Sequence, residues 1–102
     1  MSNWIPIAKI SECADGECIE CVAQGQIVAL FNVNGEFFAL DGICPHQGGP
    51  LGKGQLESCT VTCPWHGWQF NVTDGKNVLT DRVVQPQFSV KLEGDVVLVE
   101  IP

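Results

Sequence analysis

Two stretches, Cys44-Pro45-His46 and Cys63-Pro64-Trp65-His66, stand out in this sequence of 102 residues and are separated by the sixteen residues from Gln47 to Thr62. Each stretch contains one cysteine and one histidine within a single turn of chain. Together they offer two thiolate and two imidazole donors, a set that is typical of a metal site. A zinc finger usually groups its cysteines in one arm and its histidines in the other, whereas each arm here holds one of each.

Short strands separated by turns are predicted on both sides of these stretches, and no segment shows the periodicity of a helix. Asn34-Gly35 is a strong hairpin signal between two apolar runs. Pro6 places the first strand at a sheet edge or at a bulge. We therefore expect an all-β domain, a small antiparallel sandwich or barrel. Its predicted strands cover residues 4–10, 18–22, 27–33, 36–40, 55–57, 59–62, 68–72, 87–92 and 96–101.

The composition limits the possible partners and surroundings of the protein. The net charge of −7 argues against nucleic acid and anionic membranes, and it favours a basic protein partner. No apolar run is long enough to span a membrane. The N-terminus lacks the features of a secretory signal, so we expect a cytoplasmic protein with reduced thiols.

The motif Cys-x-His, sixteen residues, Cys-x-x-His resembles that of the Rieske-type ferredoxins, and residues 44–51 and 63–67 strengthen the likeness. The resemblance implies one [2Fe-2S] cluster as cofactor. Two cysteines would bind one iron and two histidines the other. It also implies a single domain over residues 1–102, in which a cluster-binding subdomain at roughly 42–70 is inserted in a basal β domain, with Gln85-Pro86 in the loop that covers the cluster. The implied cofactor-binding and metal-binding residues are Cys44, His46, Cys63 and His66.

The residues around the motif resemble those of low-potential members of this family. High-potential members carry an additional cysteine in each cluster loop, joined as a disulfide, where this chain has Gly49 and Trp65. They also place a serine and a tyrosine, which donate hydrogen bonds to sulfur, where this chain has Trp68 and Phe70. Such hydrogen bonds stabilise the reduced state, so their absence predicts a reduction potential near the lower end of the Rieske range, about −150 mV.

Low-potential members of the family serve mainly as ferredoxins of ring-hydroxylating oxygenase systems. The resemblance therefore implies a soluble one-electron carrier between a flavin-dependent reductase and a terminal oxygenase that acts on aromatic rings. No nucleophile, general acid or substrate pocket is evident in the sequence, which favours a carrier over an enzyme. Electrons would pass through His46 and His66. Pro45, Gln47 and Trp65 would form a largely apolar contact rim around them, with acidic residues further out guiding the approach of the partner.

Three other functions remain open at this point. The small subunit of an assimilatory NAD(P)H nitrite reductase resembles the expected fold and length, although some of these subunits lack the cluster ligands. The N-terminal domain of an oxygenase catalytic subunit is disfavoured, because no catalytic domain follows before Pro102. A structural zinc module would be colourless and free of iron.

Four further cysteines need a separate explanation. Cys13, Cys18 and Cys21 have the Cys-x4-Cys-x2-Cys spacing of a plant-type [2Fe-2S] ferredoxin, and Cys59 is the one remaining candidate for a fourth ligand. In a strand, however, Cys18 and Cys21 would point to opposite faces of the sheet. We therefore expect thiols in the core or in an edge strand. The large aromatic residues are expected to fill the core: Trp4, Phe31, Phe37, Phe38 and Phe88.

Overall fold

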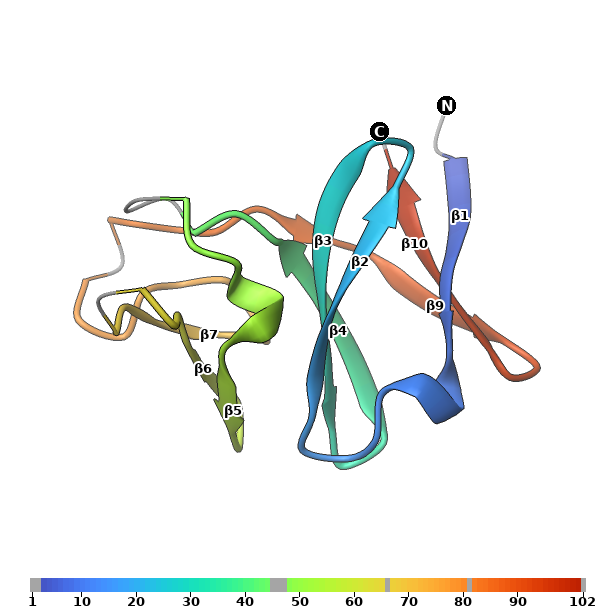
Figure 1. The fold of residues 1–102 in the computed structure, drawn as a ribbon, viewed down its shortest axis with the longest axis horizontal. Coiled ribbons are helices and arrows are strands. Elements are labelled where there is room, and N and C mark those ends of the chain that lie inside the picture. The colour runs from blue at the N-terminus through green and yellow to red at the C-terminus, as the bar shows by residue number, and fades with distance from the viewer. Residues whose placement is uncertain (1–2, 45–47, 66, 81, 102) are drawn as a thin grey trace.

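Three antiparallel sheets form the computed structural model, which describes residues 3–44, 48–65, 67–80 and 82–101 (Figure 1). The first sheet has the order β1-β10-β9 and is built from β1 (Asn3–Lys9), β9 (Val90–Glu93) and β10 (Val96–Ile101). The second has the order β2-β3-β4-β8 and is built from β2 (Cys18–Ala23), β3 (Gln26–Val33), β4 (Glu36–Asp41) and β8 (Gln87–Phe88). The third consists of β5 (Gln55–Glu57), β6 (Thr60–Thr62) and β7 (Gln69–Asn71). The predicted all-β class is confirmed.

The hairpin between β3 and β4 forms where the sequence predicts it. Val33 pairs with Glu36, and Asn34 and Gly35 between them have φ angles of 56° and 86°. Two successive positive φ angles give the turn a twist that matches the flanking strands. The hairpin therefore delivers the chain through β4 to Cys44.

Strand β3 lies between two separate hydrophobic cores. Leu30 packs in the first core, which the second sheet shares with the first sheet. Phe31 packs in the second core, which lies between the opposite face of the second sheet and the third sheet. The five residues from Val28 to Asn32 are all buried. A strand that is buried on both faces needs apolar residues at successive positions, which explains the unbroken apolar run here.

Strand β1 is an edge strand, as Pro6 predicts. Its pairing with β10 shifts register between Pro6 and Ala8, so the residue that cannot donate to the ladder lies at an irregularity. The prediction that Trp4 fills the core is wrong. Its ring is half-buried, and the Lys91 ammonium lies 4.5 Å from the ring centroid, where the cation and the indole face attract each other.

The other four predicted core aromatic residues do pack inward. Phe31 and Phe37 are buried, and Phe38 and Phe88 are half-buried against the two cores.

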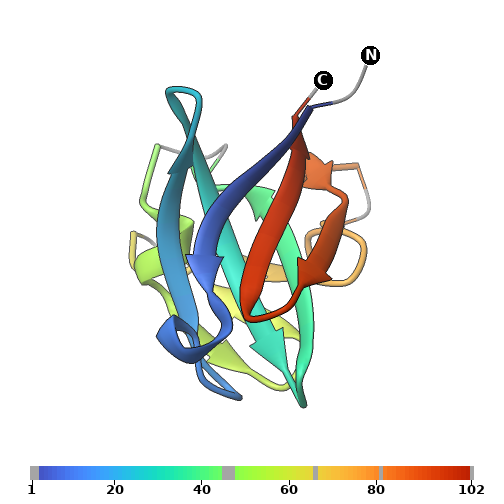
Figure 2. The same ribbon diagram turned by 90° about the vertical axis from the view of Figure 1, so that its right-hand side faces the viewer.

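The segment 87–92 forms two strands, and the prediction of one continuous strand is wrong. β8 pairs with β4 in the second sheet, whereas β9 pairs with β10 in the first. The chain changes sheets at Ser89, whose carbonyl accepts a hydrogen bond from the Glu100 N–H at 2.9 Å. This crossing joins the two sheets at a corner, as the view onto the first sheet shows (Figure 2).

Two short 3-10 helices interrupt the strands, η1 (Ile10–Glu12) and η2 (Leu51–Lys53). The second lies in the glycine- and proline-rich segment 47–54, for which the sequence predicts no strand. It begins after Pro50, and the buried Leu51 side chain anchors it in the second core.

The third sheet lies at one end of the molecule and the sheet of β1, β9 and β10 lies at the other (Figure 1). In the described part of the chain, no helix is long and apolar enough to cross a membrane.

Candidate metal centre

The first cysteine stretch lies in a loop that closes on itself like a narrow hairpin, and we call residues 42–51 loop 1. The Cys44 N–H donates a hydrogen bond to the Gly49 carbonyl at 2.8 Å, and the Gly48 N–H donates to the Cys44 carbonyl at 2.9 Å. Below them, the Leu51 N–H donates to the Gly42 carbonyl at 2.9 Å. Cys44 is thus fixed at the point where the loop closes. Pro45, His46 and Gln47 lie outside the described residues.

The second cysteine stretch lies in a similar loop between β6 and β7, and we call residues 63–68 loop 2. The Cys63 N–H donates to the Trp68 carbonyl at 2.7 Å. In both loops a cysteine N–H thus donates to the carbonyl of the fifth residue after it. Beside this closure, the Gln69 side-chain amide donates to the Thr62 hydroxyl at 3.1 Å. His66 lies outside the described residues.

The two loops meet through Gly49. A Cβ atom on Gly49 would lie only 2.7 Å from the Cys63 Sγ atom and 3.0 Å from the Trp65 Cβ atom. Cys44 and Cys63 are each 1% exposed and pack in the same core. The structure therefore brings the two predicted cysteine ligands into one buried region, and it needs glycine at position 49 to leave room for the Cys63 sulfur.

Gly49 and Trp65 are also the two positions at which the high-potential proteins carry their additional cysteines. The structure places these positions side by side, as the resemblance implies. The Trp65 side chain is 50% exposed. At these positions the two loops are held together by packing and not by a covalent bond.

Loop 1 and the residues directly after it rest on the second sheet through close contacts. Gly52 approaches β2 so closely that a Cβ atom would lie 2.7 Å from the Ile19 carbonyl oxygen. The Cys18 thiol donates to the Gly54 carbonyl at 3.4 Å. The Gly42 N–H donates to the Ile27 carbonyl at 2.9 Å. The second sheet therefore supports loop 1 on both its entering and its leaving side.

Gln85 is a buried polar residue whose contacts the sequence does not predict. It is 1% exposed, and its side-chain Nε2 donates to the carbonyl oxygens of Asp41 and Ile43, at 2.6 Å each. The Asp41 N–H donates in turn to the Pro86 carbonyl at 2.8 Å. The 85–86 segment therefore contacts the chain directly before Cys44. Residue type alone does not predict this contact, because a glutamine in a polar loop is usually exposed. The one signal is the family resemblance, which places Gln85-Pro86 in the loop that covers the cluster.

The remaining cysteines are divided between the two hydrophobic cores. Cys13 and Cys21 are buried in the first core, whereas Cys18 packs against the second, so the predicted alternation is confirmed. Burial raises the pKa of Cys13 and of Cys21 to about 11, and burial also raises the pKa of Cys18. These thiols stay protonated at neutral pH and are poor nucleophiles.

No group of three or more histidine, cysteine, aspartate and glutamate side chains gathers as a metal site within the described residues. The plant-type cluster therefore has no support from the geometry. Of the predicted Rieske ligands, the structure describes Cys44 and Cys63, and it does not describe His46 or His66.

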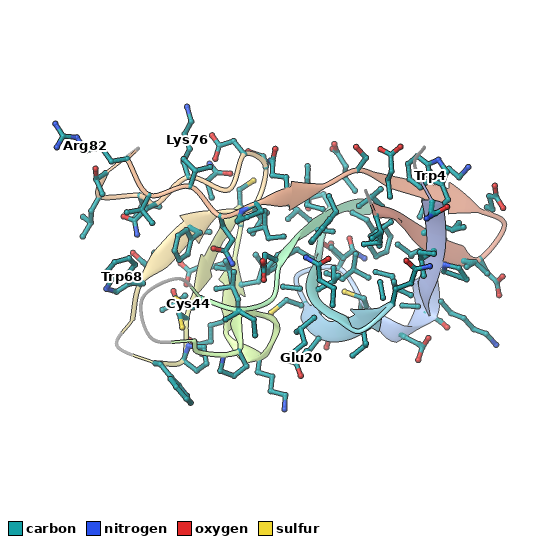
Figure 3. All side chains as sticks on the ribbon, turned by 90° about the horizontal axis from the view of Figure 1, so that it is seen from above. Trp4, Glu20, Cys44, Trp68, Lys76 and Arg82 are labelled. Atoms are coloured by element: carbon teal, nitrogen blue, oxygen red, sulfur yellow. The ribbon has the colours of Figure 1, made fainter. Side chains whose placement is uncertain are left out.

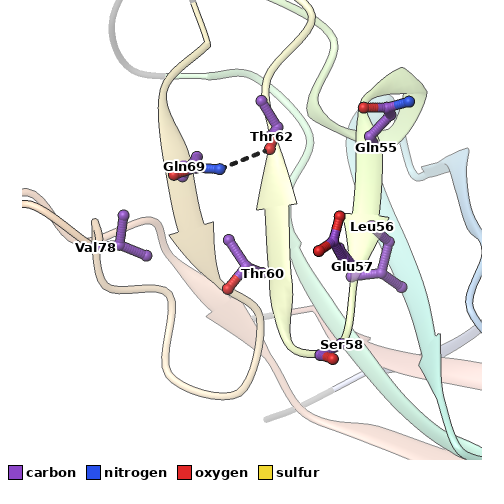
Figure 4. A pocket seen from close by; sticks show the side chains of 8 residues that line it. All are labelled: Gln55, Leu56, Glu57, Ser58, Thr60, Thr62, Gln69 and Val78. Carbon is purple, nitrogen blue, oxygen red and sulfur yellow. Dashed lines mark hydrogen bonds between the residues drawn. The ribbon is translucent and has the colours of Figure 1, made fainter.

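A surface hollow on the third sheet lacks a catalytic set of side chains. It is lined by eight residues, of which Glu57 is the one that can ionise (Figure 4). The other lining side chains are hydroxyl, amide and aliphatic groups, and the Gln69 to Thr62 hydrogen bond crosses part of the hollow. A carboxylate without a base, nucleophile or cation beside it does not form a catalytic set.

The described part of the site fits an iron–sulfur cluster. Two buried sulfurs lie in adjacent loops, and the missing side chain of Gly49 leaves the room that the Cys63 sulfur occupies. Phe70 is fully buried in the same core and carries no hydroxyl group. Cys44 lies inside this end of the molecule, with Trp68 beside the same loops and Trp4 at the far end (Figure 3).

Comparison with known proteins gives a consistent result. The family model for the Rieske [2Fe-2S] domain matches residues 3–97. The ferredoxin component of the naphthalene 1,2-dioxygenase system of Pseudomonas aeruginosa is 31% identical over 101 residues, which cover 97% of this chain and 96% of the relative.

Two solved structures share the fold over nearly the whole chain. The ferredoxin of Sphingomonas yanoikuyae B1 has a TM-score of 0.88 at 24% identity, over 98% of this chain and all of that one. A chain in the complex of reduced oxygenase and oxidised ferredoxin of carbazole 1,9a-dioxygenase has a TM-score of 0.84 at 26% identity, over 94% and 91% of the two chains.

A protein described as a putative small subunit of an NADPH nitrite reductase has the same fold as well. Its TM-score is 0.83 over 95% of this chain and 97% of that one, but only 14% of the residues are identical. At this identity the likeness concerns the fold alone.

Proposed function

Because the chain belongs to the Rieske [2Fe-2S] domain family, we propose that it is a one-electron carrier, the ferredoxin component of a multicomponent oxygenase system. The observation that carries this proposal is the buried pair Cys44 and Cys63 in two adjoining loops, in a chain that aligns almost end to end with a dioxygenase ferredoxin.

We propose Cys44, His46, Cys63 and His66 as the ligands of the single [2Fe-2S] cluster. When bound, the cluster supplies one-electron redox chemistry. The two cysteines hold it on the buried side, where the loops close and the second core excludes water. The two histidines complete the donor set that the sequence motif indicates.

The partners that we propose are a flavin-dependent reductase and a terminal oxygenase that acts on aromatic rings. The named systems of the relative and of the solved complex, naphthalene 1,2-dioxygenase and carbazole 1,9a-dioxygenase, support this class of acceptor. We also propose that residues of roughly 42–70 form the cluster-binding subdomain and that the protein is cytoplasmic. In support of that location, the structure pairs none of Cys13, Cys18, Cys21 and Cys59 in a disulfide.

Exposed apolar side chains near the two loops give a partner a surface to dock on, which we call the apolar rim. Val78 and Leu79 lie beside Gly67 and Trp68 of loop 2, and Leu79 is 92% exposed. The remaining exposed members of the rim are Ile43 and Trp65. An electron carrier must place its redox centre close to that of its partner, so a rim around the cluster loops is where contact is useful.

The decisive experiment combines spectroscopy with electron transfer. Purified protein should contain iron and acid-labile sulfide, and the dithionite-reduced form should show a rhombic EPR signal with a mean g value below that of the free electron. It should then pass electrons from a flavin reductase to the terminal oxygenase of the naphthalene 1,2-dioxygenase system. A colourless zinc protein would contradict the cluster, and copurification with a large sirohaem subunit would favour the nitrite reductase role instead.

A further inference from the structure

We propose that Gln85 is a positioning residue for the cluster ligand Cys44, acting through the backbone of loop 1. The proposal rests on the ligand role of Cys44 proposed above. It concerns a side chain that is 44 residues from its partner Asp41 in sequence and is buried against the entry to the loop.

Three successive carbonyl groups precede Cys44, and each accepts a hydrogen bond. The Asp41 and Ile43 carbonyls both accept from the Gln85 side-chain amide, at 2.6 Å each, and the Gly42 carbonyl accepts from the Leu51 N–H at 2.9 Å. A side-chain amide carries two N–H hydrogens, so Gln85 uses its full donor capacity on these two carbonyls. Without the Gln85 amide, the Asp41 and Ile43 carbonyls would each lose this hydrogen bond.

Gln85 is itself held firmly in place from a third segment. Its backbone N–H donates to the Gly75 carbonyl at 2.7 Å, and the Gly75 N–H donates to the Asn71 carbonyl at 2.7 Å. The Gln85 carbonyl oxygen passes so close to Gly75 that no Cβ atom would fit there, and Gly75 has a φ angle of 77°. The amide is therefore fixed from one side by the turn after β7 and presents its donors to loop 1 on the other.

The position of these bonds suggests more than general stabilisation. Ile43, which accepts one of them, is the residue directly before Cys44. A ligand whose preceding peptide can rotate would bind iron with variable geometry, and residues that orient ligands from outside the coordination sphere commonly affect metal affinity about 10–100-fold. Gln85 holds the carbonyl of this peptide through Ile43, opposite the Cys44 N–H that donates to the Gly49 carbonyl, and its second bond holds the Asp41 carbonyl two residues earlier.

Gln85→Met tests the inference, because methionine fills a similar volume without any N–H donor. Gln87→Met is the matched control: Gln87 is exposed, lies two residues further on, and donates to the Thr73 carbonyl at 2.7 Å, away from loop 1. With the intact chain carrying its cluster, we expect Gln85→Met to lose iron to a chelator roughly tenfold faster than the wild type and to broaden the EPR signal of the reduced protein. Gln87→Met should match the wild type in both respects.

Two additional variants keep the test decisive. Gln85→Asn retains a buried amide on a shorter side chain and should show the same changes at smaller size, even if Gln85→Met does not assemble a cluster. If Gln85→Met and Gln85→Asn only lower the melting temperature and leave iron release and the EPR signal unchanged, Gln85 has no positioning role. If Cys44→Ser retains the wild-type EPR signal, Cys44 is not a ligand, and the inference fails together with the proposed ligand set.

Discussion

At the scale of single residues, the site depends on what is missing as much as on its donors. Gly49 has no side chain, so the Cys63 sulfur and the Trp65 ring occupy the space where a Cβ atom would be. Phe70 has no hydroxyl group, so it gives the cluster region no hydrogen-bond donor from its side chain. The missing side chain at position 49 thus makes room for the Cys63 sulfur. The missing hydroxyl group at position 70 removes a hydrogen bond that would raise the reduction potential of the cluster.

Gly49→Ala should weaken the hold on the cluster. The added methyl group must displace Trp65 or the Cys63 sulfur, which overpacks the loops at a cost of about 1–3 kcal/mol. We expect faster iron release and a shifted EPR signal. Gly16→Ala serves as the control, since Gly16 has a φ angle of 82° with open space around it, so that variant should lose stability through backbone strain alone. Equal iron release from the two variants would contradict the steric role of Gly49.

At the scale of secondary-structure elements, the central sheet separates the functions of the two cores. Its β3 and β4 strands contribute Leu30 to the first core, away from the loops, and Leu40 to the second core, which contains Cys44 and Cys63. One face of this sheet therefore packs against the sheet of β1, β10 and β9, and its other face packs against the core that contains the two cysteines of the candidate metal centre.

A pair of leucine substitutions can separate these two roles. Leu30→Ala and Leu40→Ala each remove a fully buried leucine and should each lower the free energy of unfolding by about 2–5 kcal/mol in chemical denaturation. Because the cavities open in different cores, only Leu40→Ala should also accelerate iron release. A change of equal size in Leu30→Ala would mean that the two cores are not mechanically separate.

At the scale of the whole molecule, the net negative charge lies outside the segment that contains the two cysteine loops. Residues 42–84 contain three acidic and three basic residues, so the entire net charge of −7 belongs to the rest of the chain. Lys76 and Arg82 project outward at the end that holds the two loops (Figure 3). The expectation of a basic partner therefore concerns long-range approach, whereas the proposed contact surface is the apolar rim.

Leu79→Asp should slow electron transfer to the oxygenase, because a charge on the apolar rim must be desolvated when the partner docks. The control is Leu92→Asp, since Leu92 is 47% exposed on β9 at the opposite end and should transfer electrons at the wild-type rate. Stopped-flow reduction of the oxygenase measures both. Equal rates for the two variants, with an unchanged reduction potential, would show that docking occurs elsewhere.

How much could be predicted depended on how local the determining interactions are. The hairpin at Asn34-Gly35, the irregularity at Pro6 and the opposite orientation of Cys18 and Cys21 follow from steric preferences of a few neighbouring residues, and the structure agrees with them. The break at Ser89 was missed because it depends on which sheet each half of the segment joins. Trp4 was misplaced because its partner Lys91 lies on a strand distant in sequence.

The sequence by itself determined the β class and the family and predicts the donor set, because strand alternation and candidate ligands can be recognised from residue type and spacing. Only the tertiary structure decided that Gly49 opens space for the Cys63 sulfur, that Gln85 holds the chain entering loop 1, and that β3 serves two cores. These features join segments tens of residues apart. Close approach and hydrogen bonding at such separations depend on how the sheets pack, and no local pattern of residues specifies that.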